Sequence, residues 1–180
     1  YADKVTTVSP SYSQEILTPQ YGEHLEMVLN MRKYDLWGIT NGIDIESWNP
    51  MSDPEIPYHF NKVNAQAQKK ENKLALQKEL GLQEDPNVLL VGVVSRLTWQ
   101  KGFYLLMEKL NELCAAPIQL AVLGSGEPLI EEKMAQLEAG NKGKIVFYRG
   151  YNESLSHRIY AASDLFLMPS LFEPCGISQI

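Results

Sequence analysis

VLLVGVVSRLTWQKG, residues 88–102, places a continuous apolar run directly before a loop that carries two cations. An apolar run of strand length without polar alternation is typical of a strand buried on both faces of a parallel sheet. Arg96 follows this run after one residue, and Lys101 precedes Gly102 at the start of a stretch with helical spacing. We therefore expect a buried strand, a basic loop and a helix in that order.

The same alternation of strand and helix continues towards the end of the chain. Further runs of strand length are IQLAVL at 118–123, KIVFYR at 144–149 and DLFLMP at 164–169. Apolar residues recur at helical spacing between these runs: Phe103, Leu106, Met107, Leu110, Leu113, Ile130, Met134, Leu137, Leu155, Ile159 and Ala162. This order predicts an α/β fold, a doubly wound parallel sheet with right-handed crossovers.

Shorter elements are expected near the start of the chain. KVTTVSP at 4–10 is β-branched and ends in Ser-Pro, which predicts a short strand running into a loop. SYSQEIL at 11–17 favours a short helix. The pair Asn41-Gly42 is a strong turn signal.

A proline-rich segment separates this region from the sheet. NPMSDPEIPYHF contains Pro50, Pro54 and Pro57, which predicts an ordered connector and excludes a helix or central strand. The following Lys/Gln/Ala/Leu-rich stretch, 62–80, predicts a helix that stops at Gly81.

Composition argues against several classes of protein: nucleic-acid-binding, metal-binding, disulfide-rich and membrane-spanning. The 180 residues carry a net charge of -6, and the 16 Lys and Arg are scattered, so a broad nucleic-acid surface is not expected. Cys114 and Cys175 suggest neither a metal site nor a disulfide framework, which favours a cytosolic type of protein. No apolar run approaches membrane-spanning length and no signal peptide is recognisable. Because the chain starts without Met in strand-like sequence, we expect it to be part of a longer protein.

The loops after the predicted strands are the places to look for a ligand, because ligands of open α/β sheets bind outside the carboxyl ends of the strands. In the first of these loops Arg96 and Lys101 would point at one space beside a helix start, which suits a phosphate or diphosphate. The alternative is a solvated pair of cations on a loop.

The second loop, GSGEP at 124–128, resembles the start of a dinucleotide fingerprint but has Leu129 where the third glycine would fall. Its amides, with Ser125 among them, are candidates to face a phosphate. The alternative is a tight strand-to-helix turn with Glu127 in the first helical turn. The incomplete fingerprint, together with the lack of an acidic residue at the end of the next strand, argues against a dehydrogenase.

The last two loops also carry candidates. Tyr151 can stack on a base or cover the sheet edge, and Asn152 is expected to cap the following helix. Glu173, between Phe172 and Pro174, can bind sugar hydroxyls or can be an exposed loop carboxylate.

Neither the cysteine nor the histidine near these loops is expected to be catalytic. Cys175 has no base near it in the sequence, so covalent catalysis is not expected, and His157 is expected to be structural.

Taken together, the stretches ADKVTTVSPSYSQEI, NGID, VVSRLTWQKG, SHRIYAASD and PSLFEPCGISQ resemble the glycogen and starch synthases in order and spacing. These are retaining glucosyltransferases of the GT-B class, with two facing Rossmann-like domains. The residues in these stretches are most similar to those of bacterial glycogen synthases, and plastid starch synthases have closely similar sequences. The resemblance implies that residues 1–57 are the end of an N-terminal domain with its connector. Residues 58–180 would then be the nucleotide-sugar-binding domain, incomplete at its end.

The resemblance also implies roles for individual residues. The basic pair Arg96 and Lys101 would contact and stabilise the leaving diphosphate of ADP-glucose, and Glu173 would engage the donor glucose; these are the candidate catalytic residues. Further substrate contacts are implied at Asn41, Asp44, Ser125, Tyr151, Gly176, Ile177 and Ser178. The family often has Leu-Thr where this chain has Ile177-Ser178, and its lysine-glycine-glycine motif would lie before Tyr1.

The implied reaction is transfer of glucose from ADP-glucose to the non-reducing end of an α-1,4-glucan with retention of configuration. No cofactor or metal is implied, and the partners would be the nucleotide sugar and the glucan, without nucleic acid or membrane. The implied compartment is the bacterial cytoplasm, or the plastid for a starch synthase, and the chain alone is expected to be inactive. Two alternatives stay open: a related transferase with another nucleotide sugar or acceptor, and a non-catalytic nucleotide- or glucan-binding module.

Overall fold

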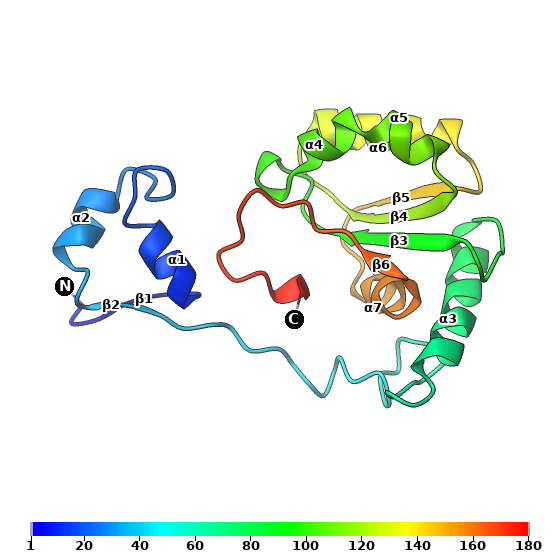
Figure 1. The fold of residues 1–180 in the computed structure, drawn as a ribbon, viewed down its shortest axis with the longest axis horizontal. Coiled ribbons are helices and arrows are strands. Elements are labelled where there is room, and N and C mark those ends of the chain that lie inside the picture. The colour runs from blue at the N-terminus through cyan, green and yellow to red at the C-terminus, as the bar shows by residue number, and fades with distance from the viewer. Residues whose placement is uncertain (1, 180) are drawn as a thin grey trace. The chain divides into compact units, whose positions relative to one another are not determined.

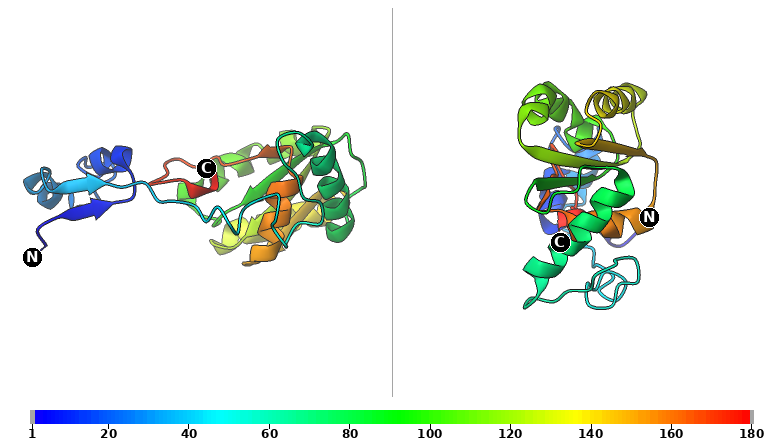
Figure 2. Two further views of the ribbon diagram at one scale, coloured as in Figure 1. Left: turned by 90° about the horizontal axis from the view of Figure 1, so that it is seen from below. Right: turned by 90° about the vertical axis from the view of Figure 1, so that its right-hand side faces the viewer.

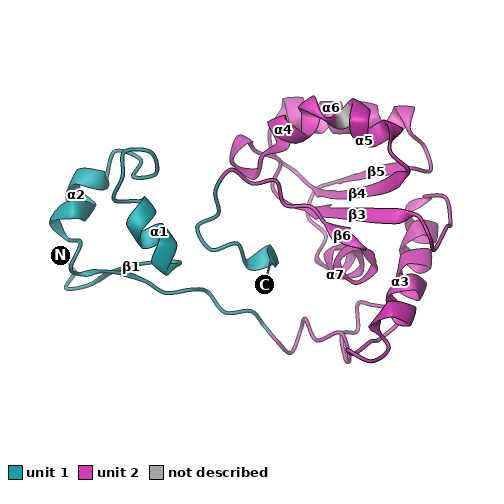
Figure 3. Ribbon diagram, in the orientation of Figure 1, with its two compact units in different colours: residues 1–44, 172–180 teal, residues 45–171 magenta. Residues whose placement is uncertain are grey.

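The computed structural model describes residues 2–179, apart from the side chain of Leu110. The chain forms two compact units (Figure 3): unit 1 comprises residues 1–44 and 172–180, and unit 2 comprises residues 45–171. The division of the whole protein into domains at residue 57 stays a prediction.

Unit 1 is built around two short parallel strands, β1 (Val5–Thr7) and β2 (Leu36–Gly38). Two helices, α1 (Pro10–Glu15) and α2 (Glu26–Met31), lie between them in the sequence. Ser9 caps α1 with its side chain, and Pro occupies the first helical position, where the missing N–H costs nothing. The strand and the helix predicted from residues 4–17 are thereby confirmed.

The turn predicted at Asn41-Gly42 is wrong. Residues 39–44 leave β2 without any turn, and the chain turns only at residues 45–48. An Asn-Gly pair makes a tight turn when the two flanking strands pair with each other in antiparallel fashion. Here β2 pairs in parallel with β1, and no strand follows Gly42 to close a hairpin.

Unit 2 contains a parallel sheet of four strands in the order β5-β4-β3-β6. The strands are β3 (Leu89–Val94), β4 (Ile118–Gly124), β5 (Ile145–Arg149) and β6 (Leu165–Phe166). From β3 the chain builds outward through β4 and β5, then returns to add β6 on the other side of β3 (Figure 1). The strand order therefore reverses between β3 and β6, which is the topological switch point of the sheet.

Helices cover both faces of this sheet (Figure 1; Figure 2). One face carries α4 (Phe103–Glu108), α5 (Leu110–Ala115) and α6 (Pro128–Gly140). The other face carries α3 (Ala65–Leu80) and α7 (Glu153–Ala162). The predicted doubly wound parallel α/β fold is confirmed, and α3 ends at Gly81 as expected.

Two predicted elements differ in extent. The helix expected from Phe103 to Leu113 is broken at Lys109, whose N–H donates to the carbonyl of Leu106 at 3.1 Å, three residues back and not four. The strand expected over 164–169 is paired only at Leu165–Phe166, opposite Val91 and Gly92, so the chain leaves the sheet before β3 ends at Val94.

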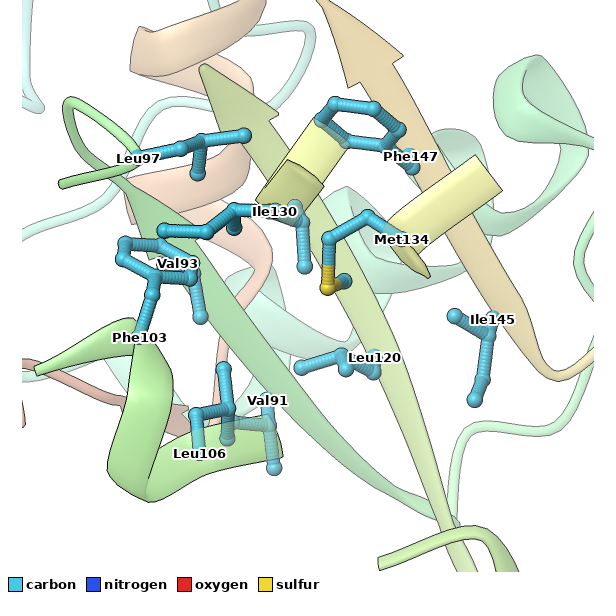
Figure 4. Packing of buried hydrophobic residues seen from close by; sticks show 11 residues of the cluster. Val91, Val93, Leu97, Phe103, Leu106, Leu120, Ile130, Met134, Ile145 and Phe147 are labelled. Carbon is cyan, nitrogen blue, oxygen red and sulfur yellow. The ribbon is translucent and has the colours of Figure 1, made fainter. Parts of the chain in front are cut away.

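The core consists of two clusters separated by the sheet, because side chains of a strand alternate between its faces. Figure 4 shows the first cluster, in which Phe103 and Met134 from the helices point at Val93 and Leu120 from the strands. The second cluster lies under α3 and α7, and its members are Leu76, Leu82, Leu90, Ala121, Leu123, Leu155, Ile159 and Ala162.

A glycine within β3 lets α7 approach the sheet closely. A Cβ atom on Gly92 would lie 2.1 Å from Ser163 Oγ and 2.8 Å from Ile159 Cγ2. The glycine inside VLLVGVV therefore serves helix-on-sheet packing, and a larger residue would push α7 away from the sheet.

The proline-rich connector is free of helix and strand, as predicted, and it contacts α7. Trp48 stacks on the ring of His157, with ring centroids 3.6 Å apart and planes 12° apart. The Nδ1 atom of His157 lies 2.7 Å from Asp53 Oδ2, and both side chains are 5% exposed. His157 is thus structural, as expected, because it joins the connector to the helix.

Candidate functional site

The loops that leave β3 and β6 are packed together at the switch point. The N–H of Leu171 donates to the carbonyl of Gln100 at 2.9 Å. Gly102 has a φ of 73°, and a Cβ there would lie 1.9 Å from the carbonyl oxygen of Pro169. Residues with a side chain rarely adopt this φ, and there is no space here for a Cβ atom. Glycine is therefore required where the two loops meet.

The predicted cations lie on the first of these loops. Arg96 is exposed, and Lys101 is half-buried at the end of a 3-10 turn, η1 (Trp99–Lys101). The turn is closed by hydrogen bonds from Lys101 N–H to Thr98 O at 3.1 Å and from Gly102 N–H to Trp99 O at 2.9 Å. Both cations therefore follow β3 at the edge where a ligand of such a sheet is expected.

The loop after β4 is hydrogen-bonded to the loop after β3. Leu97 N–H donates to Ser125 O at 2.9 Å, and Glu127 N–H donates to Leu97 O at 2.8 Å. Leu97 and Gly126 form an isolated parallel bridge, and Leu97 itself is fully buried. Ser125 thereby lies beside the basic loop, with its side chain exposed.

Two amides of GSGEP are not available to a phosphate. The N–H of Gly126 donates to Glu131 Oε1 at 2.8 Å, and that of Glu127 is bonded to Leu97. The hydrogen bond from Gly126 lowers the pKa of Glu131, and an ion pair with Arg149 adds to the effect. The Glu131 carboxylate thus occupies the start of α6, and the hydrogen bonds of these two amides support the interpretation of GSGEP as a tight turn. A substrate contact at Ser125 stays a prediction.

Glu127 makes contacts that sequence reasoning missed. Its Oε1 accepts the backbone N–H of Trp99 at 2.8 Å, and its Oε2 accepts the hydroxyl of Tyr104 at 2.7 Å. The hydrogen bond to the Glu127 carboxylate raises the pKa of Tyr104. These partners lie more than twenty residues back in the sequence, and no local pattern marks such a pairing.

Tyr151 lies beyond the end of β5, two strands away from β3. Its side chain is 85% exposed, and its hydroxyl donates to Glu153 Oε2 at 3.2 Å, which raises the pKa of Tyr151. Asn152 caps α7 as predicted, because its Oδ1 accepts the N–H of Leu155 at 2.9 Å. An exposed ring at this edge is accessible for stacking on a planar ligand.

The remaining predicted residues belong to unit 1. Glu173 is half-buried between two anchored neighbours. The ring of Phe172 lies 5.1 Å from that of Tyr21, and the carbonyl of Pro174 accepts the hydroxyl of Ser9 at 2.6 Å. The fixed position expected for Glu173 within PSLFEPCG is therefore provided by the N-terminal segment, which sequence reasoning did not foresee.

The other unit 1 candidates lie near the end of the chain and on the segment after β2. Gly176 is buried with a φ of 76° and precedes a 3-10 turn, η2 (Ile177–Gln179). Asn41 and Asp44 are exposed on the segment that leaves β2. The structure thus places Arg96, Lys101, Ser125 and Tyr151 in unit 2, the first three on the hydrogen-bonded loops after β3 and β4. The remaining candidates lie in unit 1.

Within residues 2–179, no group of three or more His, Cys, Asp or Glu side chains is arranged to hold a metal ion. Cys114 and Cys175 are both free thiols. None of the helices described is long and apolar enough to cross a membrane.

Comparison with known proteins gives two family matches. Residues 72–180 match the model described as glycosyl transferases group 1, and residues 1–31 match the starch synthase catalytic domain.

Curated relatives match over essentially the whole chain. The chain is 48% identical over 180 residues to a glycogen synthase of Lachnospira eligens and covers 38% of that protein. It is 49% identical to a glycogen synthase of Bacillus licheniformis, over 99% of this chain and 37% of that protein. The chain therefore spans less than two fifths of the length of these relatives.

A solved structure is similar over the same range. It is the catalytic domain of starch synthase IV from Arabidopsis thaliana, bound to ADP and acarbose. The similarity has a TM-score of 0.91 at 42% identity and covers 99% of this chain and 37% of that one.

Proposed function

Because the chain belongs to the glycosyl transferases group 1 family, we propose that it is part of a glycogen synthase of the GT-B class. The complete protein would transfer glucose from ADP-glucose to the non-reducing end of an α-1,4-glucan, with retention at the anomeric carbon. The observation that carries this proposal is the basic loop of Arg96 and Lys101, held at the switch point of a parallel sheet. Relatives named as glycogen synthases over the whole chain support it.

The chemistry of the transfer explains why cations are needed there. When the bond between the sugar C1 and the phosphate oxygen breaks, the diphosphate takes up negative charge and the sugar ring becomes positive. Fixed cations lower the energy of that state most when they are already in position. We assign the diphosphate to Arg96 and Lys101 and the donor glucose to Glu173. The acceptor oxygen forms the new bond to C1, and its proton passes to the leaving diphosphate.

The remaining expectations belong to the same proposal. No cofactor is assigned, and the donor ADP-glucose and the glucan are the partners. The proposed compartment is the bacterial cytoplasm, with the plastid as the alternative. Further substrate contacts are assigned to Asn41, Asp44, Ser125, Tyr151, Gly176, Ile177 and Ser178. The chain alone is expected not to transfer glucose, because it spans only part of the relatives' length.

The test is a transfer assay on the complete protein with ADP-, UDP- and GDP-glucose as donors and glycogen as the acceptor. We expect glucose to be incorporated mainly from ADP-glucose, in linkages that an α-1,4-specific amylase releases. Preference for UDP- or GDP-glucose would assign the site to a different transferase of this class. No transfer from any donor, with binding of ADP or glucan intact, would favour a non-catalytic binding module.

A further inference from the structure

We propose that Glu127 is a positioning residue for the transfer: it holds the turn that carries Lys101 against the start of α6. This proposal rests on the proposed function of Lys101. Glu127 itself need not touch the substrate, since it acts through the loop.

Glu127 contacts the basic loop and the helix after it with three separate groups. Its N–H bonds to Leu97 O at 2.8 Å, its Oε1 to Trp99 N–H at 2.8 Å, and its Oε2 to the Tyr104 hydroxyl at 2.7 Å. Both carboxylate oxygens are therefore used, on donors that lie on either side of Lys101. A charged acceptor makes such bonds stronger than a neutral one would.

These bonds fix one side of η1, and the loop after β6 fixes the other. On that second side lie the bond from Leu171 N–H to Gln100 O at 2.9 Å and the contact of Gly102 with Pro169. Trp99 is 58% exposed, so its side chain adds little packing to hold the turn. The Glu127 carboxylate, which accepts the Trp99 N–H, is thus an anchor at the first residue of the turn.

The position of the turn matters because a cation acts on the transition state only from a preorganised position. A displacement of about 1 Å can cost roughly 100-fold in rate even when the mutated residue lies away from the reacting atoms. Loosening η1 should therefore lower turnover more than donor binding, since ground-state contacts tolerate small displacements better.

The kinetic test uses the complete protein with ADP-glucose and glycogen. Glu127→Ala should lower kcat by about 10- to 100-fold, with the KM for ADP-glucose changed less than about threefold. Glu127→Gln should keep most of kcat, because its amide can still accept from Trp99 N–H and donate to Tyr104. The matched control is Glu132→Ala, an exposed carboxylate on the same helix whose side chain accepts a bond from Gln136. Wild-type kcat in Glu127→Ala, or equal loss in the Gln variant, overturns the proposal.

A second measurement separates this inference from the proposed function. Hydrogen exchange of the Trp99 amide, measured without ligand, reports the anchor directly. Glu127→Ala should speed this exchange by at least about tenfold and leave the amide of Val93 in β3 unchanged. Unchanged exchange at Trp99 overturns the positioning role, whatever the activity. A wild-type protein that fails to transfer glucose would instead refute the proposed function and leave this test decisive.

Discussion

Lys101 differs from other lysines of the chain in having its backbone fixed on both sides of a turn at the switch point. Replacing it in the complete protein should cost about 3 kcal/mol of transition-state stabilisation, which is a fall in kcat of roughly 100-fold. We expect Lys101→Ala to change kcat more than the KM for ADP-glucose. Lys142→Ala, an exposed lysine in the loop before β5 at the other edge of the sheet, serves as the control. A normal kcat with only a raised KM would reject the assigned role.

Tyr151 has an exposed ring and a hydroxyl, and two substitutions separate the contribution of each to the binding of ADP-glucose. Stacking on a base is worth about 1 to 3 kcal/mol, so Tyr151→Ala should raise the KM for ADP-glucose by about 5- to 150-fold. Tyr151→Phe keeps the ring and removes the hydrogen bond to Glu153, and should behave like the wild type. Equal defects in both variants would show that the hydroxyl and not the ring is needed.

At the level of elements, Glu131 closes the start of α6 and makes the fold sensitive to acid. Its pKa lies below the ordinary value of 4.5, first because Gly126 N–H donates to it. A depressed carboxyl pKa stabilises the fold above the unfolded-state value, and this contribution is lost as the pH falls through the folded-state value. Glu131→Gln should therefore lower the Tm at neutral pH, and the difference from the wild type should narrow on acidification. Glu132→Gln is the control, and a difference in Tm that stays constant with pH would contradict this account.

The connector is held to α7 by a buried pair. Asp53 Oδ2 lies 2.7 Å from His157 Nδ1, and Asp53 Oδ1 also accepts the N–H of Glu55 at 2.9 Å. Leaving a buried polar group without its hydrogen-bond partner typically costs about 1 to 3 kcal/mol. Asp53→Ala should lower the free energy of unfolding by about 2 kcal/mol, as measured by urea denaturation. A loss below about 1 kcal/mol would mean that the pair contributes little.

The elements that the sequence predicted well are those whose signals are local. The apolar runs of β3 and β4, the cap at Asn152 and the stop at Gly81 depend on neighbours along the chain. The break at Lys109 and the short β6 carry no such local signal. The turn predicted at Asn41-Gly42 does not form, because a tight Asn-Gly turn needs two antiparallel strands and β2 pairs in parallel with β1.

At the scale of the whole molecule, the edge of the sheet that carries the site was predictable, and its internal contacts were not. Parallel strands put their carboxyl ends at one edge whatever the side chains, so Arg96, Lys101 and Ser125 could be placed there. The contacts of Glu127 with Trp99 and Tyr104 join segments 28 and 23 residues apart, which spacing alone does not reveal.

Arg96, Lys101 and Glu173 are the three residues that the proposed glucose transfer requires most directly. The most direct measurement compares the complete protein with a variant in which all three are replaced by glutamine, using labelled ADP-glucose and glycogen. We predict that incorporation falls by at least about 1,000-fold, since the variant removes more than one preorganised group and a single such group is worth about 100- to 1,000-fold, while the Tm stays near that of the wild type. Wild-type incorporation by the triple variant would contradict this prediction and leave Arg96, Lys101 and Glu173 without a catalytic role.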